Sequence, residues 1–336
     1  MNEESKTRIL WVDVAKGLGV FFVILGHLWY DCSPQIVNKA IYAFHMPMFF
    51  ILSGFVFGVS EKYRSFSAFV SEKAKRLLAP AILYIFIYAL IYIPRSWGEL
   101  GLRSTIIRAL YLKGECLFNY PCWFFITLFE IYVLMYLIRI QRMNLKAKAA
   151  VMLAFALIGY AVYTYRLIPY FGIDRAIISS CFFVAGTVIK DIYDKNAITK
   201  AGHFSVFFVS LFMFLFFGIF VNDKVSFYGR NLGHYFPFLL SGLFGSIIFF
   251  YICRCISDNK ISRYCRITAD NSVFIVGTHY IAASLFRTLG RVSGMSYTWY
   301  FSLLAVIYTI LLVGIYRRVC RILDARVPIL TGKRKA

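Results

Sequence analysis

Apolar runs of about twenty residues recur along the whole 336-residue chain, and they constrain its fold more than any other feature. A helix needs about 20 predominantly apolar residues to cross the hydrocarbon core of a bilayer. Because 60% of the residues are hydrophobic and the mean hydropathy is +0.69, the chain is too apolar for a soluble globular domain. We therefore predict an all-α, polytopic membrane helix bundle.

The apolar runs predict about ten transmembrane helices. Their approximate ranges are 10 to 30, 41 to 60, 78 to 94, 122 to 139, 149 to 166, 175 to 190, 204 to 221, 232 to 253, 270 to 287 and 299 to 317. The connections on one side of the membrane hold about 25 lysines and arginines, and those on the other side about 11. Since the richer side stays in the cytoplasm, both termini are predicted to be cytoplasmic. The longest outer connection, about 95 to 121, is expected to include a short surface helix.

The net charge of +21 does not indicate nucleic-acid binding. The lysines and arginines form short clusters between apolar runs rather than one basic face, so we attribute them to topology and lipid headgroup contact. The first apolar run lacks a small-residue cleavage motif and is expected to remain as a membrane span rather than a signal peptide. The eight cysteines include no C-x-x-C pair, so no metal is predicted. A disulfide among Cys32, Cys116 and Cys122 stays open, since membrane cysteines also serve as small apolar residues.

The first apolar run, Arg8 to His27, carries ionisable groups that are costly in hydrocarbon. On a helix, Lys16 and His27 are separated by roughly 20° of rotation and roughly 16 Å of rise, so they share a face. Asp13 precedes Lys16 by three positions, so these two side chains can form an ion pair on that face. The run therefore predicts one wall of a polar cavity inside the membrane.

Several motifs resemble the acyltransferase-3 family of bacterial integral-membrane acyltransferases, and most of all its fucose 4-O-acetylase-like branch. The first two motifs are R-x-x-x-x-D-x-x-K-G followed by His27, and F-H-M-P-M-F-F-I-L-S-G-F at residues 44 to 55. Later matches are K-A-K-R-L-L-A-P at 73 to 80, W-F-F-I-T-L-F at 123 to 129 and N-S-V-F-I-V-G-T-H at 271 to 279. The resemblance implies a cytoplasmic segment over 1–9, a transmembrane acyltransferase domain over 10–317 and a basic cytoplasmic tail over 318–336.

The resemblance implies that His27 is the catalytic residue. A neutral imidazole can take a proton from a hydroxyl, because its unperturbed pKa lies near neutrality. The alternative is a histidine that only hydrogen-bonds a neighbouring helix. Asp13 is assigned a catalytic role in orienting a group or holding a positive charge, or else it is only the ion-pair partner of Lys16 or Arg8.

Three cations are predicted to bind the acyl donor. Lys16 stands where many relatives have arginine, and Lys73 and Arg76 resemble the family's R-x-x-R pair, again with lysine first. Three positions apart on a helix, Lys73 and Arg76 are expected to point together. They would hold the phosphates of acyl-CoA at the inner mouth of the cavity. The alternative is that this basic connection acts only as a topology signal.

Four polar or aromatic residues are predicted to bind the acceptor: His45, Trp123, Asn271 and His279. Each has a structural alternative. His45 lies in a motif whose Pro47 and Ser53-Gly54 favour a kink and close helix packing. Trp123 is typical of an interfacial aromatic belt. Buried polar groups such as Asn271 and His279, together with Glu130, need partners and are expected to line the cavity of His27.

The chain is therefore interpreted as an O-acyltransferase of the bacterial cytoplasmic (inner) membrane. It would move an acyl group, most simply acetyl, from acetyl-CoA to a hydroxyl of a cell-surface polysaccharide or its lipid-linked precursor, without a metal. The partners are the acyl-CoA, the glycan and membrane lipids. The rivals are a secondary transporter, because intramembrane charges also mark ion pathways, and a non-catalytic membrane subunit of a polysaccharide synthesis or export system. Transporters often contain inverted repeats, and none is evident in this sequence.

Overall fold

The computed structural model describes residues 9–29, 35–58, 65–96, 119–167, 170–196, 198–256, 260–295 and 299–326. Within these ranges the regular structure is helical, and extended pairing is limited to an isolated bridge between Ser226 and Asn231. Ten stretches among the described residues are long and apolar enough to cross a membrane. The predicted helical membrane bundle is confirmed, and an even number of crossings agrees with termini on one side.

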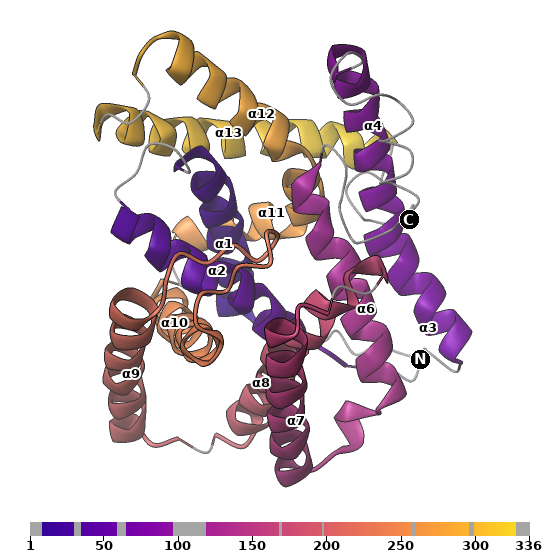
Figure 1. The fold of residues 1–336 in the computed structure, drawn as a ribbon, viewed down its shortest axis with the longest axis vertical. Coiled ribbons are helices and arrows are strands. Elements are labelled where there is room, and N and C mark those ends of the chain that lie inside the picture. Colours follow the sequence, from indigo (N-terminus) through magenta and orange to yellow (C-terminus); the bar gives the residue numbers. More distant parts are fainter. Residues whose placement is uncertain are drawn as a thin grey trace.

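The helices follow one another through short connections (Figure 1). They are α1 (Leu10–Leu28), α2 (Gln35–Phe55), α3 (Phe66–Lys73), a π-helix (Ala74–Leu78), α4 (Ala79–Ser96), α6 (Trp123–Leu137), α7 (Leu145–Thr164), α8 (Ile173–Asp194), α9 (Lys200–Phe214), a second π-helix (Leu215–Val221), α10 (Tyr235–Cys255), α11 (Lys260–Asp270), α12 (Ser272–Val292) and α13 (Trp299–Arg326).

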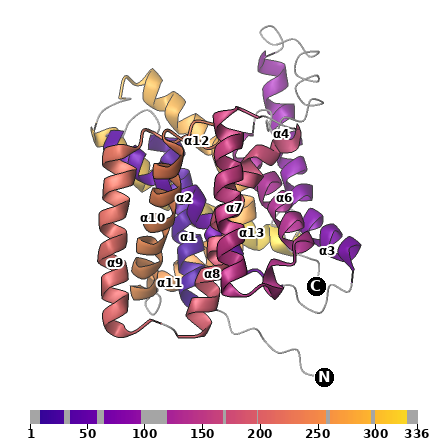
Figure 2. The same ribbon diagram turned by 60° about the horizontal axis from the view of Figure 1, so that its bottom comes forward.

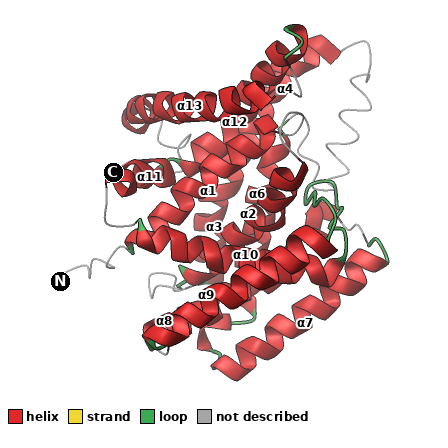
Figure 3. Ribbon diagram, turned by 90° about the vertical axis from the view of Figure 1, so that its left-hand side faces the viewer, coloured by secondary structure: helices red, strands yellow, loops and turns green. Residues whose placement is uncertain are grey.

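Helix α1 lies at the centre of the bundle. It packs against α2, α10, α11, α12 and α13, and residues such as Val14, Val20 and Ile24 are completely buried. Figure 3 shows α12 and α13 on one side of α1 and α7, α8 and α9 on the other. A helix that is apolar almost all round is suited to this central position. Its few ionisable side chains are consequently carried into the interior of the bundle.

Helices α2 and α8 cross with their backbones in direct contact. A Cβ atom on Gly54 would overlap the carbonyl oxygen of Phe183, and a Cβ on Gly186 would overlap that of Ile51. Small residues allow such close approach in membranes, where association depends on packing rather than on exclusion of water. The Ser53-Gly54 motif therefore has the structural role of helix packing.

The ninth predicted span, 270 to 287, is a correction, because the chain forms two helices there. Helix α11 precedes α12, and the break falls at Asn271. One face of α11, including Ser262 and Cys265, is buried, and a Cβ on Gly17 of α1 would overlap the backbone of Cys265. The sequence hid α11 because it is too short and polar to read as a span, and only its packing on α1 stabilises it.

The third predicted span also differs, because the helix begins at Phe66 rather than near 78 and includes a π-helical turn. The N–H of Ala79 bonds the carbonyl of Ala74, five residues back. In a regular α-helix the N–H of residue 80 would bond the carbonyl of Arg76, but Pro80 has no N–H. The wider turn accommodates this missing donor, and such π-bulges are frequent at functional sites.

Other boundaries shift by several residues. The second helix spans Gln35–Phe55 rather than 41 to 60, and the last one continues to Arg326 instead of ending near 317, so the first part of the predicted tail is helical. Residues 97 to 118 of the proposed surface helix lie outside the described residues. So do Cys32 and Cys116, whereas Cys122 is a buried free thiol. Figure 2 shows α7, α9 and α10 running nearly parallel across the bundle.

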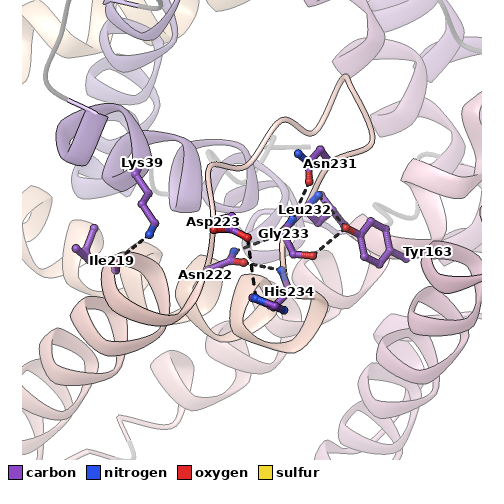
Figure 4. Close-up of polar contacts among 9 residues, drawn as sticks. All are labelled: Lys39, Tyr163, Ile219, Asn222, Asp223, Asn231, Leu232, Gly233 and His234. Carbon is purple, nitrogen blue, oxygen red and sulfur yellow. Dashed lines mark hydrogen bonds and ion pairs between the residues drawn. The ribbon is translucent and has the colours of Figure 1, made fainter.

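The loop between α9 and α10, residues 222–234, is held in place by side-chain hydrogen bonds (Figure 4). The Asn222 amide donates to the carbonyl of Leu232 over 3.1 Å and accepts from the N–H of His234 over 2.7 Å. The Tyr163 hydroxyl on α7 accepts from the N–H of Leu232 over 3.3 Å. We call this segment the outer loop, because the predicted topology places it on the outer side of the membrane.

Candidate active site

The predicted base, His27, lies near the end of α1 and contacts α12. Its ring centroid is 5.1 Å from that of His279 and 5.7 Å from that of Tyr280. His279 is completely buried, whereas His27 is only partly buried. The His27 ring therefore lies between two helices of the bundle rather than against lipid, and part of its surface stays accessible.

The hydrogen-bonding state of His279 follows from its backbone contacts. Its Nδ1 lies 2.9 Å from the carbonyl oxygen of Val276 and 3.1 Å from that of Ile275. Carbonyl oxygens only accept hydrogen bonds, so Nδ1 carries a hydrogen and donates it. In the neutral ring Nε2 is then an acceptor, and it is buried without a hydrogen-bond partner among the described residues. A buried, open acceptor thus stands beside His27.

His45 of α2 is the third histidine of this group. It is buried, and its Nδ1 donates to the carbonyl of Ile41 over 2.8 Å. Its ring centroid is 5.0 Å from that of Tyr42, whose hydroxyl donates to the carbonyl of Gly26 over 3.2 Å. Both His45 and His279 lie close enough to act electrostatically on the His27 ring. The structure thus gathers the three predicted histidines from α1, α2 and α12.

Two neighbours of His27 were missed in the sequence, Tyr280 and Arg287. The Arg287 guanidinium lies 5.4 Å from the centre of the Tyr280 ring, and it is also an electrostatic neighbour of His27. The two residues are seven positions apart on α12, so they share a helix face. That spacing was the available signal, but Arg287 had been counted as a charge of an outer connection.

The polar stripe of α1 continues inward from His27. The helix is unbroken from Leu10 to Leu28, so the separation of roughly 16 Å between Lys16 and His27 on one face holds. Asp13 is buried and Lys16 is partly buried. Helix α11 packs along α1 and meets it at Gly17. The two predicted polar residues therefore lie inside the bundle, on the side of α1 that leads to His27.

Lys73 and Arg76 lie at and within the π-helical turn and make different contacts. The Lys73 Nζ atom lies 4.1 Å from the centre of the Tyr132 ring of α6. The Arg76 side chain is 56% exposed, with its Nη1 3.7 Å from a carboxylate oxygen of Glu72. A π-turn has more residues per turn than an α-helix, so three positions rotate these side chains apart. One cation is tucked against α6, and the other faces the surroundings.

Trp123 and Asn271 occupy other settings. Trp123 is only 5% exposed, and its ring stacks on Phe227 with centroids 5.2 Å apart. The Arg175 guanidinium lies 5.6 Å from the centre of the same ring. Asn271 donates its side-chain N–H to the carbonyl of Ile267 over 2.7 Å, at the break between α11 and α12. Trp123 is thus a packed residue of the outer loop, and Asn271 is a turn residue.

A cavity of about 610 Å³ lies elsewhere, at the end of the bundle where α1 begins. Its lining includes Trp11, Tyr193, His203 and Arg254, from α1, α8, α9 and α10. Trp11 precedes His27 by sixteen positions, which is roughly 160° of rotation around α1. The cavity therefore lies on the face of α1 opposite to His27. Among the described residues, no group of three or more metal-ligating side chains is present.

Comparisons with known proteins agree with the motifs. A profile of the acyltransferase-3 family, described as an acyltransferase domain, matches residues 9–318. Nodulation protein NolL of Mesorhizobium japonicum is 31% identical over 140 residues, which are 39% of this chain and 36% of that protein. Nodulation protein NolL of Sinorhizobium fredii is 32% identical over 90 residues, or 24% of each chain. The chain thus spans about a third and a quarter of these curated relatives. No solved structure matches.

Proposed function

Since this chain belongs to the acyltransferase-3 family of integral-membrane acyltransferases, we propose that it is an O-acetyltransferase of the bacterial cytoplasmic membrane. It moves acetyl from cytoplasmic acetyl-CoA to a hydroxyl of a cell-surface glycan or its lipid-linked precursor. The observation that carries the proposal is the contact of His27 with the buried His279, 5.1 Å between ring centroids, inside the bundle. Intramembrane ionisable residues at such cost are functional by default.

The site can perform the transfer without a metal. His27 takes the proton of the acceptor hydroxyl, and the oxygen attacks the carbonyl carbon of the thioester. When the tetrahedral intermediate collapses, the C–S bond breaks and the CoA sulfur leaves with the proton returned by His27. The Arg287 guanidinium, an electrostatic neighbour of His27, offsets the negative charge that develops on the carbonyl oxygen.

His279 acts as a positioning residue in this scheme. Because its Nδ1 donates to backbone carbonyls, its orientation is fixed, and its Nε2 can accept a hydrogen bond from His27 or from the acceptor hydroxyl. Asp13 assists from the inner half of the same stripe by balancing the positive charge of Lys16. Asn271 contributes by holding the start of α12, on which His279 is carried.

The donor approaches from the cytoplasmic end. His27 lies about 25 Å along α1 from its first residue, Leu10, so the thioester must travel most of the way through the bundle. The long pantetheine arm of CoA suits this path along the stripe of Lys16. The phosphates stay at the inner mouth, where Lys73 and Arg76 supply positive charge.

Combined replacement of Lys73 and Arg76 by alanine is expected to raise the KM for acetyl-CoA by about 10-fold or more, because charge-assisted contacts to the phosphates are lost. The KM for the acceptor should change less than twofold. Lys75→Ala is the matched control, since Lys75 is an exposed cation of the same π-turn. Equal changes in the KM values for donor and acceptor would contradict a donor site and favour a topology role.

The proposed activity is tested with the purified protein in proteoliposomes. Labelled acetyl-CoA is enclosed inside, and surface polysaccharide freed of O-acyl groups by mild alkali is supplied outside. We expect alkali-labile label on the polysaccharide. A secondary transporter would move label across the membrane without attaching it, and a non-catalytic subunit would do neither, so either result would overturn the proposal.

A further inference from the structure

A row of three tyrosines leads from the surface of the bundle to His27. The ring centroids of Tyr228 and Tyr120 are 4.9 Å apart, those of Tyr120 and Tyr280 are 5.6 Å apart, and those of Tyr280 and His27 are 5.7 Å apart. Tyr120 is 41% exposed, whereas Tyr228 and Tyr280 are partly buried. We call Tyr228, Tyr120 and Tyr280 the tyrosine row.

Each tyrosine of the row comes from a different segment and is held from behind. Tyr120 follows the buried Asn119, whose side chain donates to the carbonyl of Gly277 on α12 over 2.8 Å. Tyr228 belongs to the outer loop, and its carbonyl accepts a hydrogen bond of 2.9 Å from Arg175. The row is therefore built by contacts between segments that are distant in the sequence.

The outer loop that carries Tyr228 is also fixed by an ion pair. The Nε atom of Arg230 lies 2.6 Å from a carboxylate oxygen of Asp174, which is almost completely buried at the start of α8. Together with the hydrogen bonds of Asn222 and Tyr163 (Figure 4), this contact orders the loop before any substrate arrives. A preorganised site binds more tightly, because less entropy is lost on binding.

We propose that the tyrosine row binds a sugar ring of the acceptor and presents one of its hydroxyls to His27. Tyrosine offers a flat apolar face with a hydroxyl at its tip. A sugar ring matches this surface, because it has apolar C–H faces bordered by hydroxyl groups. The inference rests on the proposed function and deepens it, since it names where a carbohydrate acceptor would lie.

The alternative is an aromatic belt, in which tyrosines sit at the membrane surface and contact headgroups. Belt residues need no connection with the interior, whereas this row ends on the ring of His27. The cations also follow the row, because Arg175 lies 5.2 Å from the centre of the Tyr228 ring and Arg287 lies 5.4 Å from that of Tyr280. Cation–π contacts of this kind hold the rings in place.

The test replaces the exposed member of the row. Tyr120→Ala is expected to raise the KM for alkali-treated surface polysaccharide about 5- to 10-fold and to leave the KM for acetyl-CoA unchanged, since a stacking face is removed. Tyr120→Phe keeps the ring and should retain most of the affinity. The matched control is Tyr160→Ala, because Tyr160 of α7 is 44% exposed and stacks on Phe236 outside the row. The KM values of this control should equal those of the wild type.

Binding is measured separately from transfer, with fluorescently labelled oligosaccharides of that polysaccharide and the purified protein in nanodiscs without acetyl-CoA. Affinity that falls in Tyr120→Ala but not in Tyr160→Ala supports the row, even if no acetyl transfer is detected and the proposed function fails. Absence of binding to the wild type would overturn the row. Equal losses in Tyr120→Ala and Tyr160→Ala would identify both residues as belt tyrosines and would overturn it as well.

Discussion

Replacement of His27 by alanine is expected to lower kcat for acyl transfer by about 10²- to 10⁴-fold, the range that general base catalysis supplies. The side chain lies between α1 and α12 with its ring next to those of His279 and Tyr280. No neighbouring group can replace it as a base without moving, because both His279 and His45 are held through Nδ1 to backbone carbonyls. The measurement is the initial rate of label transfer in proteoliposomes at saturating donor and acceptor.

The control for this prediction is His203→Ala. His203 is also a histidine within a membrane helix, but it bonds the hydroxyl of Tyr251 over 2.7 Å and lines the cavity on the opposite side of α1. Its replacement should leave kcat within about twofold of the wild type. Elution volume and melting temperature in detergent establish that both variants are folded. A folded His27→Ala protein that transfers acetyl at the wild-type rate would remove His27 from the catalytic role.

Replacement of Gly54 by valine is expected to prevent the bundle from folding. Any Cβ at this position would overlap the carbonyl oxygen of Phe183, and the opposite helix has the same problem at Gly186. Backbone atoms cannot rotate away as side chains do, so α2 and α8 would have to separate along their whole contact. Overpacking of a core commonly costs about 1–3 kcal/mol and sometimes more, and forced separation of two helices lies at the upper end.

The measurement is the yield and melting temperature of the protein after extraction in mild detergent. Gly54→Val should give aggregated or degraded protein, and Gly54→Ala should give a clearly lowered melting temperature. Gly314→Ala on α13 is the control, because the nearest atom to a Cβ there is the Tyr264 hydroxyl at 4.0 Å. This control should melt at the wild-type temperature or slightly above it, since alanine favours the helix. A normal melting temperature for Gly54→Val would show that the crossing is looser than described.

Much of the fold was predictable, because apolar runs of bilayer length signal membrane helices regardless of their neighbours. Helix α11 was not predictable in this way. Its 11 residues are polar on average, and the buried face that includes Cys265 exists only because Gly17 lets it approach α1. The π-turn was likewise missed, although Pro80 marked a missing backbone donor four residues after Arg76.

The candidate site was predictable in part. His27, His45 and His279 were selected from their motifs, and the structure brings them together. Trp123 was favoured for sugar stacking because tryptophan is common at membrane interfaces, but Phe227 of the outer loop covers it. Tyr120, three residues earlier, is the ring that stays exposed. No local pattern distinguishes the two, because exposure depends on a loop that lies about a hundred residues further along the chain.

The sequence by itself determined that this chain is a membrane helix bundle with a stripe of ionisable groups on its first helix. Both properties are local, since hydropathy and helical periodicity need no tertiary contact to be read. Only the tertiary structure decided which side chains surround His27. Tyr280 and Arg287 reach it because α11 and α12 replace one straight span, and Tyr120 and Tyr228 meet because the outer loop crosses to the start of α6. Such contacts depend on how helices pack, and packing is a property of the whole chain.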